Sequence, residues 1–492
     1  MRRDDIERGE RVELARKLAE FAIRPARASD AARQMIRLSC LDWAACGMAG
    51  RSEPVARLLR DGALAEAGAH EAGVFGGGRV PVRAAALVNG ATSHALDYDD
   101  THFGHIGHPS VAVFPAALAM AEREGRSLSA MLDAALIGAE ASVRMGLWLG
   151  RGHYQVGFHQ TATAGAFGAT LAAARLAGLT VEQTRHALGL AATKAAGIKA
   201  QFGTMGKPLN AGLAAECGVM AVDWAARGVT SNPGALDGVN GFGPTHHGAG
   251  DLSAFDAMGE AWQFEDVSHK FHACCHGLHA MLEALRGAKA MPERVDIHTH
   301  PRWMTVCNIE APNSGLEAKF SYRMAAAMAL SGIDTARIDA FSDDLSERGD
   351  LKALMARIRV KADAGLSELQ ARVALDDVAL EHDLAQTMPF AERQSRLHQK
   401  AQALTGRADD LWRAIEGGEL GALLDVVFGD PGLLRAESLG PGARPHVLPR
   451  QVSARRSPRR GNAVRPPAPP PTTPRNQRPA RADRPTARSS RP

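Results

Sequence analysis

The chain has 492 residues, 45% of them hydrophobic and 23% charged, which is enough for a large core and typical of a globular protein. Its formal net charge is +4, no run of 18 apolar residues occurs, and the N-terminus is too acidic and polar for a signal peptide. We therefore expect a cytoplasmic protein without membrane association, and we expect its six scattered cysteines to be free thiols.

The first half of the chain is predicted to be helical. From Val12 to about Ala261 it is rich in Ala, Leu and Gly, with apolar residues at helical spacing in 110–125 and 128–146. The run 171–179 carries a glycine just before its last leucine, which predicts a helix C-cap there. Alternation typical of strands is scarce, so helices are expected to pack on helices.

One stretch in this part, residues 90–110, concentrates ionisable side chains. It contains four histidines and three aspartates: His94, His102, His105, His108, Asp97, Asp99 and Asp100. Histidines that titrate near neutrality beside carboxylates are typical of proton-transfer sites, which predicts an active-site loop. The alternative is that Asp99 and Asp100 cap the next helix and that the histidines are solvated.

The pattern of the chain changes after Lys270. The ranges 294–300 and 356–364 alternate like half-buried strands, 378–388 has an extended pattern, and 278–287, 322–330 and 390–405 are predicted helices. These elements predict a smaller α+β domain followed by a helical segment that returns toward the first domain. No internal repeat occurs.

Five motifs follow one another along the chain. They are H-A-L-D-Y-D-D-T-H with H-P-S (94–102 and 108–110), G-F-H-Q-T-A-T-A-G-A-F-G-A (157–169), G-T-M-G-K-P-L-N-A-G-L-A-A (203–215), K-F-H-A-C-C-H-G-L-H (270–279) and K-F-S-Y-R-M (319–324). This ordered series resembles the MmgE/PrpD family over roughly residues 10–440. That family contains dehydratases, decarboxylases and epimerases of small carboxylates.

The resemblance implies a mainly α fold with an α+β part: a large all-helical domain that carries a smaller α+β lid. On this basis we expect the helical domain at 1–268, the lid at 269–389, a helical return at 390–440 and a separate tail at 441–492. The resemblance also implies a homodimer, a metal-free mechanism and no cofactor. The site is expected between the helical domain and the lid.

The resemblance assigns roles to individual residues. It implies catalytic roles for Asp97, Thr101, His108, His159 and Lys207, and a substrate-binding role for His279. Removing a proton next to a carboxylate requires a base and cationic groups that stabilise the developing dianionic enolate, and these positions supply both.

The residues themselves support these roles unequally. Lys207 lies in a Gly-rich, otherwise apolar segment, so its ammonium is expected to meet few competing charges and to anchor a substrate carboxylate. His159 opens a run of small residues typical of a buried helix, where it faces a cavity or satisfies a core hydrogen bond. Pro109 favours an extended conformation for His108. Asp97 is either the base or a partner that orients a histidine, and Thr101 could simply cap a helix.

The last motif departs from the family pattern F-S-x-P-Y. Met324 stands in the place of the usual tyrosine, and Arg323 in that of the proline. Because methionine has no proton to donate, either Tyr322 substitutes from a shifted position, or Arg323 provides a bidentate carboxylate contact, or the reaction differs. Both residues are therefore candidate substrate ligands, and a change of substrate is expected.

Metal binding is not expected. The chain has no H-E-x-x-H, and the C-C-H at 274–276 lacks paired C-x-x-C spacing. Cys274 and Cys275 are expected to be buried packing residues at a helix start. The predicted activity is that of a cofactor-free lyase, a dehydratase of a small di- or tricarboxylate such as 2-methylcitrate, acting through an enolate. The alternatives are a decarboxylase or epimerase of a related polycarboxylate, or a carboxylate-binding protein without turnover.

The tail, residues 441–492, has a composition of its own. It holds 13 Arg and one Asp, a local net charge of +12 that leaves −8 for the rest of the chain, and it holds 13 of the 26 prolines. Such a segment cannot bury enough apolar surface to offset its ordering entropy and is predicted to be disordered. Because it lacks aromatic residues that stack on bases, nucleic acid is not an expected partner.

Overall fold

The computed structural model describes residues 14–25 and 27–429, all within one compact unit. The predicted disorder of 441–492 lies outside the described residues. Among the described residues, no helix has both the length and the apolar character that crossing a bilayer requires.

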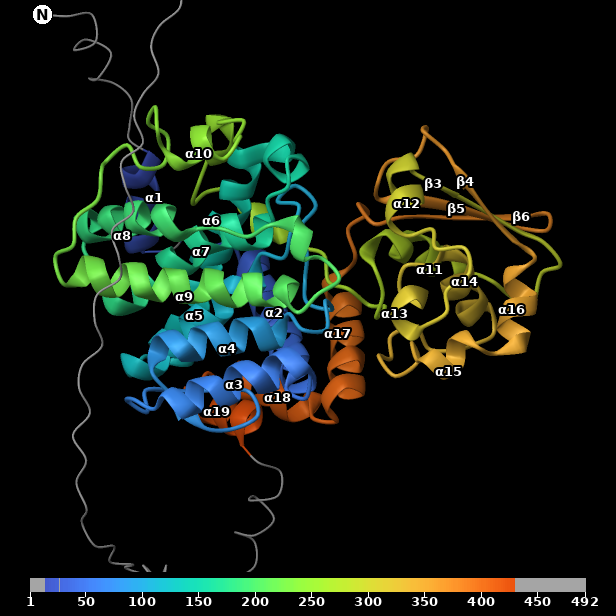
Figure 1. The fold of residues 1–492 in the computed structure, drawn as a ribbon, viewed down its shortest axis with the longest axis horizontal. Coiled ribbons are helices and arrows are strands. Elements are labelled where there is room, and N and C mark those ends of the chain that lie inside the picture. The colour runs from blue at the N-terminus through green and yellow to red at the C-terminus, as the bar shows by residue number, and fades with distance from the viewer. Residues whose placement is uncertain (1–13, 26, 430–492) are drawn as a thin grey trace, which may run out of the picture. The chain divides into compact units, whose positions relative to one another are not determined.

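The N-terminal part of the described chain is helical (Figure 1), and it contains one small antiparallel pair of strands. Its longer elements are α1 (Leu14–Ile23), α2 (Asp30–Gly50), α3 (Pro54–Glu66), β1 (Ala72–Gly73), β2 (Arg79–Val80), α4 (Val82–Ser93), α5 (Ser110–Arg123), α6 (Leu128–Gln155), α7 (Gln160–Ala177), α8 (Val181–Lys194) and α9 (Gly206–Ala226). Shorter turns of helix follow: η2 (Lys199–Gln201), α10 (Phe242–Thr245), η3 (Leu252–Phe255) and η4 (Gln263–Asp266).

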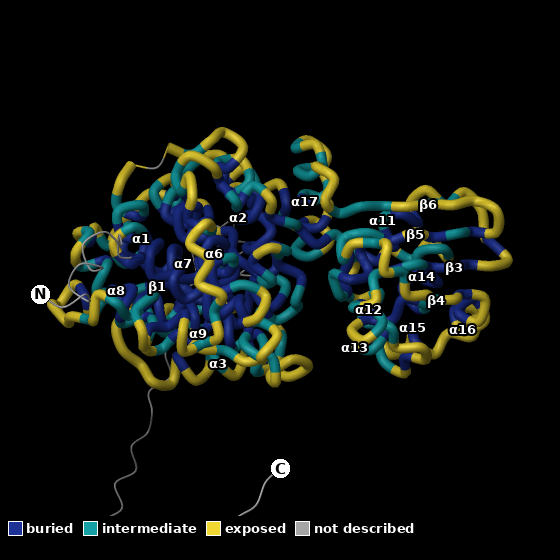
Figure 2. The backbone as a smooth tube through the Cα atoms, turned by 90° about the horizontal axis from the view of Figure 1, so that it is seen from above, coloured by how far each residue is buried: buried dark blue, intermediate teal, exposed yellow. Residues whose placement is uncertain are grey.

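Helix α7 lies at the centre of this part and packs against α5, α6 and α9. Nearly all its residues are buried, and it ends at Gly178 in the left-handed conformation, which confirms the predicted C-cap. Its many small residues allow close helix packing. A Cβ on Gly138 of α6 would lie 2.6 Å from the carbonyl oxygen of Gly168, so only glycine permits this approach. Figure 2 shows the buried interior and the exposed outer turns.

The second part of the described chain is α+β, as predicted. It contains η5 (His276–Leu278), α11 (His279–Leu285), β3 (Val295–Thr299), α12 (Pro301–Val306), α13 (Gly315–Ala318), α14 (Tyr322–Leu330), α15 (Asp343–Ser346), α16 (Gly349–Met355), β4 (Ile358–Ala362), β5 (Gln370–Leu375) and β6 (Val378–Asp383). The three predicted strands correspond to β3, β4 and β6. The sequence did not identify β5.

The four strands form one mixed sheet in the order β4-β3-β5-β6. Strand β3 runs parallel to β4 and antiparallel to β5, and Ile297 is in register with Val360 and Val373. Helix α11 packs on β5 and β6, and α14 contacts β4, so the buried side chains of the strands meet these helices in a second core.

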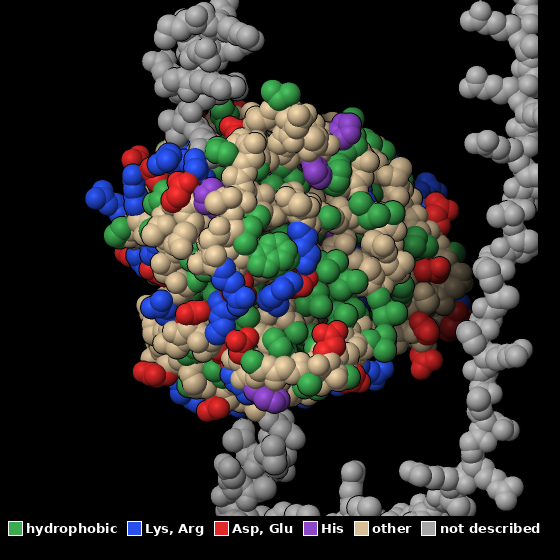
Figure 3. Space-filling view, turned by 60° about the vertical axis from the view of Figure 1, so that its left-hand side comes forward, with side chains coloured by type: hydrophobic (Ala, Val, Ile, Leu, Met, Phe, Trp, Pro, Cys, Tyr) green, Lys and Arg blue, Asp and Glu red, His purple; other side chains and the backbone are tan. Residues whose placement is uncertain are grey.

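The chain then forms α17 (Phe390–Thr405), α18 (Ala408–Gly417) and α19 (Leu420–Phe428). Helix α17 packs against α2, where the buried ammonium of Lys400 lies 2.5 Å from a carboxylate oxygen of Asp42 and donates to the carbonyl of Tyr98. This buried pair fixes α17 beside the loop that follows α4. On the face of the molecule in Figure 3, hydrophobic, acidic and basic side chains are mixed.

Candidate active site

The loop between α4 and α5 carries the predicted cluster of histidines and aspartates. Its end is held by Asp100, whose carboxylate accepts hydrogen bonds from the backbone N–H and the hydroxyl of Ser110, the first residue of α5. Asp100 therefore does anchor the next helix, as the alternative interpretation of this stretch predicted. Asp99 does not, and the histidines are buried rather than solvated.

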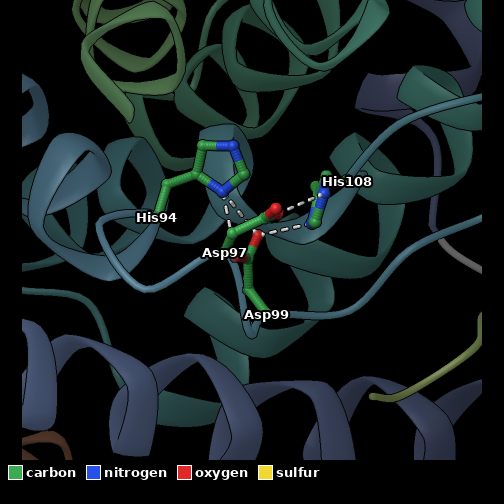
Figure 4. Close-up of side chains that lie close together, drawn as sticks. All are labelled: His94, Asp97, Asp99 and His108. Atoms are coloured by element: carbon green, nitrogen blue, oxygen red, sulfur yellow. Dashed lines mark hydrogen bonds and ion pairs between the residues drawn. The ribbon is translucent and has the colours of Figure 1, made fainter. Parts of the chain in front are cut away.

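Asp99 joins two of the histidines, as Figure 4 shows. Its carboxylate lies 2.9 Å from Nδ1 of His94 and 2.9 Å from Nδ1 of His108. Burial by itself would lower the pKa of His108, but the charge of Asp99 and the contacts with Asp97 and Asp99 outweigh it and raise that pKa. His94 has only one carboxylate partner, so burial dominates and lowers its pKa. The loop thus holds one charged and one neutral imidazole side by side.

Asp97 is the counterion of the site. Its Oδ1 atom lies 2.7 Å from Nζ of Lys207, 3.2 Å from Nζ of Lys270 and 3.2 Å from Nε2 of His108. These three cationic groups outweigh the effect of burial and hold the pKa of Asp97 well below its usual value. A carboxylate so strongly stabilised as an anion is a poor base. Of the two roles left open by the sequence, the geometry favours orientation over proton abstraction.

The backbone at Asp97 is in the left-handed region, with φ of 50°. Aspartate and asparagine tolerate this conformation better than most residues. The turn also directs the carbonyl of Asp97 toward Nζ of Lys270, which donates to it over 2.6 Å. The strained turn therefore lets one residue bind Lys270 through both its side chain and its backbone.

The surroundings of Lys207 differ from the prediction that its ammonium would meet few competing charges. Lys207 lies in the first turn of α9, and its ammonium is paired with Asp97. The sequence showed few charges near it along the chain, but the tertiary structure brings a carboxylate from the α4–α5 loop. A substrate carboxylate that binds Lys207 would share this ammonium with Asp97.

His159 immediately precedes α7, as predicted, and its imidazole is neutral. Burial, then the positive charge of Lys207, holds its pKa well below the usual value. The side-chain amide of Asn210 lies 3.2 Å from Nδ1 of His159, and the same nitrogen donates to the carbonyl of Ile198. That second bond orients the amide, so Asn210 donates to Nδ1 and the proton of His159 lies on Nε2. His159 is therefore built as a hydrogen-bond donor.

A cavity of about 690 Å³ brings these groups together. It is lined by Asp97, Thr101, His108, His159 and Lys207, five of the eight predicted site residues. Besides the imidazolium of His108, its charged side chains are five cations and two anions: Arg151, Lys199, Lys207, Lys270 and Arg302 against Asp97 and Glu368. Such an excess of positive charge suits a ligand with several carboxylates.

The structure does not bring the other three predicted residues to this cavity, which corrects their predicted position. His279 is buried in α11, where its ring packs against His272 and His276. The hydroxyl of Tyr322 donates to the carbonyl of Gly277 in the second core.

Arg323 points to Asn308 and Glu310 instead of the cavity. Met324 is fully buried in α14, so a tyrosine hydroxyl at this position would also need a partner inside the core. The structure therefore shows no replacement in this segment for the missing tyrosine.

Among the cavity residues that were not identified as site residues from the sequence are Lys270 and His276, although both lie in the motif at 270–279. Lys270 is nearly completely buried, and its charge is maintained because Asp97 and Asp99 outweigh the effect of burial and raise its pKa. His276 contacts the hydroxyl of Thr101 through Nδ1 at 2.8 Å. The short helix η5 turns His276 toward the cavity and His279 away from it. The motif at 270–279 was the signal that could have identified these residues. Only the structure of the turn shows which of its histidines faces the cavity.

Cys275 also lines the cavity, contrary to the expectation that it only fills space. Cys307 donates its S–H to the sulfur of Cys275 across 3.0 Å. This bond, with the N–H of Gly277 and the charge of Lys270, outweighs burial and lowers the pKa of Cys275. Cys274 is buried, as predicted.

The described residues contain one group with the spacing of metal ligands: His94, Asp97, Asp99 and His108, whose ligand atoms lie within 4.8 Å of one another. Its donors already hold other partners. Asp97 is bound by two ammonium groups and Asp99 by two imidazoles, so a cation would have to displace the ammonium groups from Asp97 and break the contacts of Asp99 with the imidazoles.

Comparison with known proteins gives two family matches and several curated relatives. The family model described as the MmgE/PrpD N-terminal domain matches residues 12–255, and that of the MmgE/PrpD C-terminal domain matches residues 270–400. Cis-aconitate decarboxylase of Mus musculus is 28% identical over 303 residues, which cover 58% of this chain and 61% of the mouse protein.

Two further relatives carry the same name. The Aspergillus terreus protein is 30% identical over 220 residues, 41% of this chain and 44% of its own length. The Homo sapiens protein is 35% identical over 170 residues, 34% of this chain and 35% of its own length. The matches therefore span about three fifths or less of these relatives.

Proposed function

Because the chain belongs to the MmgE/PrpD family, we propose that it is a cofactor-free lyase that removes CO₂ from a small unsaturated tricarboxylate. The relatives named cis-aconitate decarboxylase suggest this reaction rather than the dehydration predicted from the sequence. The observation that carries the choice is the state of Asp97, which three cationic groups hold as a stabilised anion in a cavity rich in positive charge.

Dehydration begins with the removal of a proton from carbon, which needs a base. Asp97 is a poor base because three cationic groups stabilise its anion, and His159 presents a proton rather than a lone pair. Decarboxylation needs no such base. When the carbon–carboxylate bond breaks, its electron pair passes to the neighbouring unsaturated carboxylate and forms a dianionic enolate.

The cavity can stabilise that dianion and protonate it. The ammonium groups of Lys207 and Lys270 both lie within 3.2 Å of Oδ1 of Asp97. A substrate carboxylate that binds beside this oxygen would therefore be held by both ammonium groups. Nε2–H of His159 can donate to the developing negative charge. The imidazolium of His108 is a charged acid in the cavity wall and can deliver the proton to carbon, which completes the reaction without a cofactor.

The test separates the possible reactions with the purified chain. Cis-aconitate, 2-methylcitrate and related acids are incubated in deuterated buffer, and products are followed by NMR together with CO₂ release. The proposal predicts stoichiometric CO₂ with one deuterium incorporated into the product. Loss of water without CO₂ would contradict the proposal and indicate a dehydratase. Exchange at carbon without net reaction would indicate an epimerase, and binding without any product would indicate a binding protein.

The family resemblance also leads us to propose a homodimer in the cytoplasm. Light scattering on the full chain should give twice the chain mass of 52.1 kDa. A monomer at micromolar concentration would contradict the dimer, and recovery of the native protein with membranes would contradict the location.

A further inference from the structure

A second group of cations lines the same cavity, apart from the residues used above. We call Lys207 and Lys270 the inner cations, whose side chains are 17% and 3% exposed. We call Arg151, Lys199 and Arg302 the outer cations, of which Arg151 is 49% and Arg302 26% exposed. Nothing in the proposed reaction uses the outer cations. Five cations are also more than the two carboxylates of a small diacid require.

The outer cations are held in place by one carboxylate and one aromatic ring. Glu368 lies 3.2 Å from Arg151 through Oε1 and 2.5 Å from Arg302 through Oε2, so each oxygen holds one guanidinium. Nζ of Lys199 lies 4.0 Å from the ring centre of Tyr154 and donates to its carbonyl. The group carries three positive charges and one negative charge.

The positive charges in this group affect one another. Burial, followed by the positive charge of Arg302, lowers the pKa of Lys199. Among the described residues no acidic group forms an ion pair with Lys199, because Glu368 is occupied by the arginines. An anion placed here would relieve the repulsion and would meet donors that are already oriented.

The backbone is shaped to bring Arg151 and Tyr154 to this place. Helix α6 is interrupted at Gly150, whose φ of 72° and ψ of 178° are accessible almost only to glycine. The carbonyls that the break releases are bound by other parts of the chain: Ala249 N–H donates to Leu149, and Gly250 N–H donates to Trp148. The break therefore redirects the last turn of α6 into the cavity wall and is stabilised from outside.

The Glu368 side of the group is equally fixed. The indole N–H of Trp303 donates to the carbonyl of Glu368 over 2.9 Å, which holds the turn before β5 against α12. Arg302 extends from the first turn of α12 and also stacks near the ring of Trp303 at 5.0 Å. Residues of α6 and of α12 thus meet on one carboxylate at the cavity wall.

We propose that the outer cations form a second carboxylate subsite, which binds the distal carboxylate of a tricarboxylate while the inner cations hold the carboxylates next to the reacting bond. The subsite makes the cavity selective for tricarboxylates over dicarboxylates. This proposal rests on the proposed function, because both take this cavity as the substrate site. It does not depend on which bond is broken.

The test uses two ligands that differ only by this carboxylate. Propane-1,2,3-tricarboxylate and methylsuccinate share the same carbon core apart from one terminal carboxylate, and neither has the double bond that the proposed reaction needs. Their dissociation constants for the full chain are measured by calorimetry. A charge-assisted contact of this kind is worth roughly 10- to 100-fold in affinity, so wild-type protein should prefer the tricarboxylate by about that factor.

Three variants test the assignment. Arg302→Gln and Lys199→Gln should each reduce the preference about tenfold by weakening tricarboxylate binding, while methylsuccinate binds as before. Glu368→Gln removes the competing negative charge and should tighten tricarboxylate binding several-fold, a gain that an unfolded variant cannot produce. Arg348→Gln removes an exposed arginine that pairs with Asp350 and is the control for overall charge.

Two results would overturn the subsite. One is equal binding of the two ligands by the wild-type protein. The other is an unchanged preference in Arg302→Gln and Lys199→Gln, even if CO₂ release has been established. If the preference follows the variants as expected but no acid is converted, the subsite stands and the proposed reaction is wrong.

Discussion

Replacing Asp97 by Asn tests whether this residue is the counterion of the cavity. Asparagine keeps the shape of the side chain and tolerates the left-handed backbone at this position, so the substitution removes the charge and little else. The ammonium of Lys270, 3% exposed, then keeps the carbonyl of residue 97 and the more distant interactions with Asp99 and Cys275.

Removing one partner of a fully buried pair costs roughly 3–5 kcal/mol. The Asp97 side chain is 38% exposed, so solvent screens part of this interaction, and we expect a loss of about 1–3 kcal/mol in the free energy of unfolding. Propane-1,2,3-tricarboxylate should restore much of the loss, because its carboxylate takes the place of Asp97 between the lysines. Ligand-induced stabilisation should therefore be larger in the variant than in the wild-type protein.

Denaturant unfolding with and without the ligand measures both effects. Asp339→Asn is the matched control, since its side chain is 69% exposed in a pair with Arg337, and it should change stability by less than about 0.5 kcal/mol. The low pKa of Asp97 means that its contribution is present above the unfolded-state value of 3.8 and is lost as pH falls below it. The difference between variant and wild type should shrink below about pH 4. Equal stability and equal ligand response in the two proteins would refute the role of Asp97.

Three further outcomes follow from the site. Lys207→Ala should raise KM and lower kcat, with a combined loss on the order of 3 kcal/mol in transition-state stabilisation. His159→Ala should lower kcat roughly 10²–10⁴-fold, with substrate binding retained in calorimetry. Wild-type turnover by either folded variant would remove that residue from the mechanism. Iodoacetamide should modify Cys275 first, because its pKa is lowered, whereas burial raises the pKa values of Cys40 and Cys217 to about 12. Peptide mapping that finds Cys40 or Cys217 modified before Cys275 would contradict the site geometry. Activity should survive exhaustive chelation, and stoichiometric metal in elemental analysis together with loss of activity would contradict a metal-free mechanism.

The sequence was a good guide to elements whose pattern is local. The predicted helices at 322–330 and 390–405 coincide with α14 and α17, and the alternation at 294–300 identified β3. Strand β5 was missed because its buried positions include the small Ala371, which weakens the alternation, while its place between β3 and β6 comes from pairing with distant residues.

The sequence by itself also determined part of the chemistry of the site, since the ordered motifs carry its histidines, Asp97, Lys207 and Lys270. Only the tertiary structure decided their state. The charge on His108, the neutral form of His159 and the poor basicity of Asp97 depend on burial and on groups from other segments, such as Lys270, 173 residues from Asp97 in the chain. The direction in which a side chain points also depends on the tertiary structure. A single turn of η5 places His276 toward the cavity and His279 in the core, and residue spacing carries no information about which side of such a turn faces a ligand.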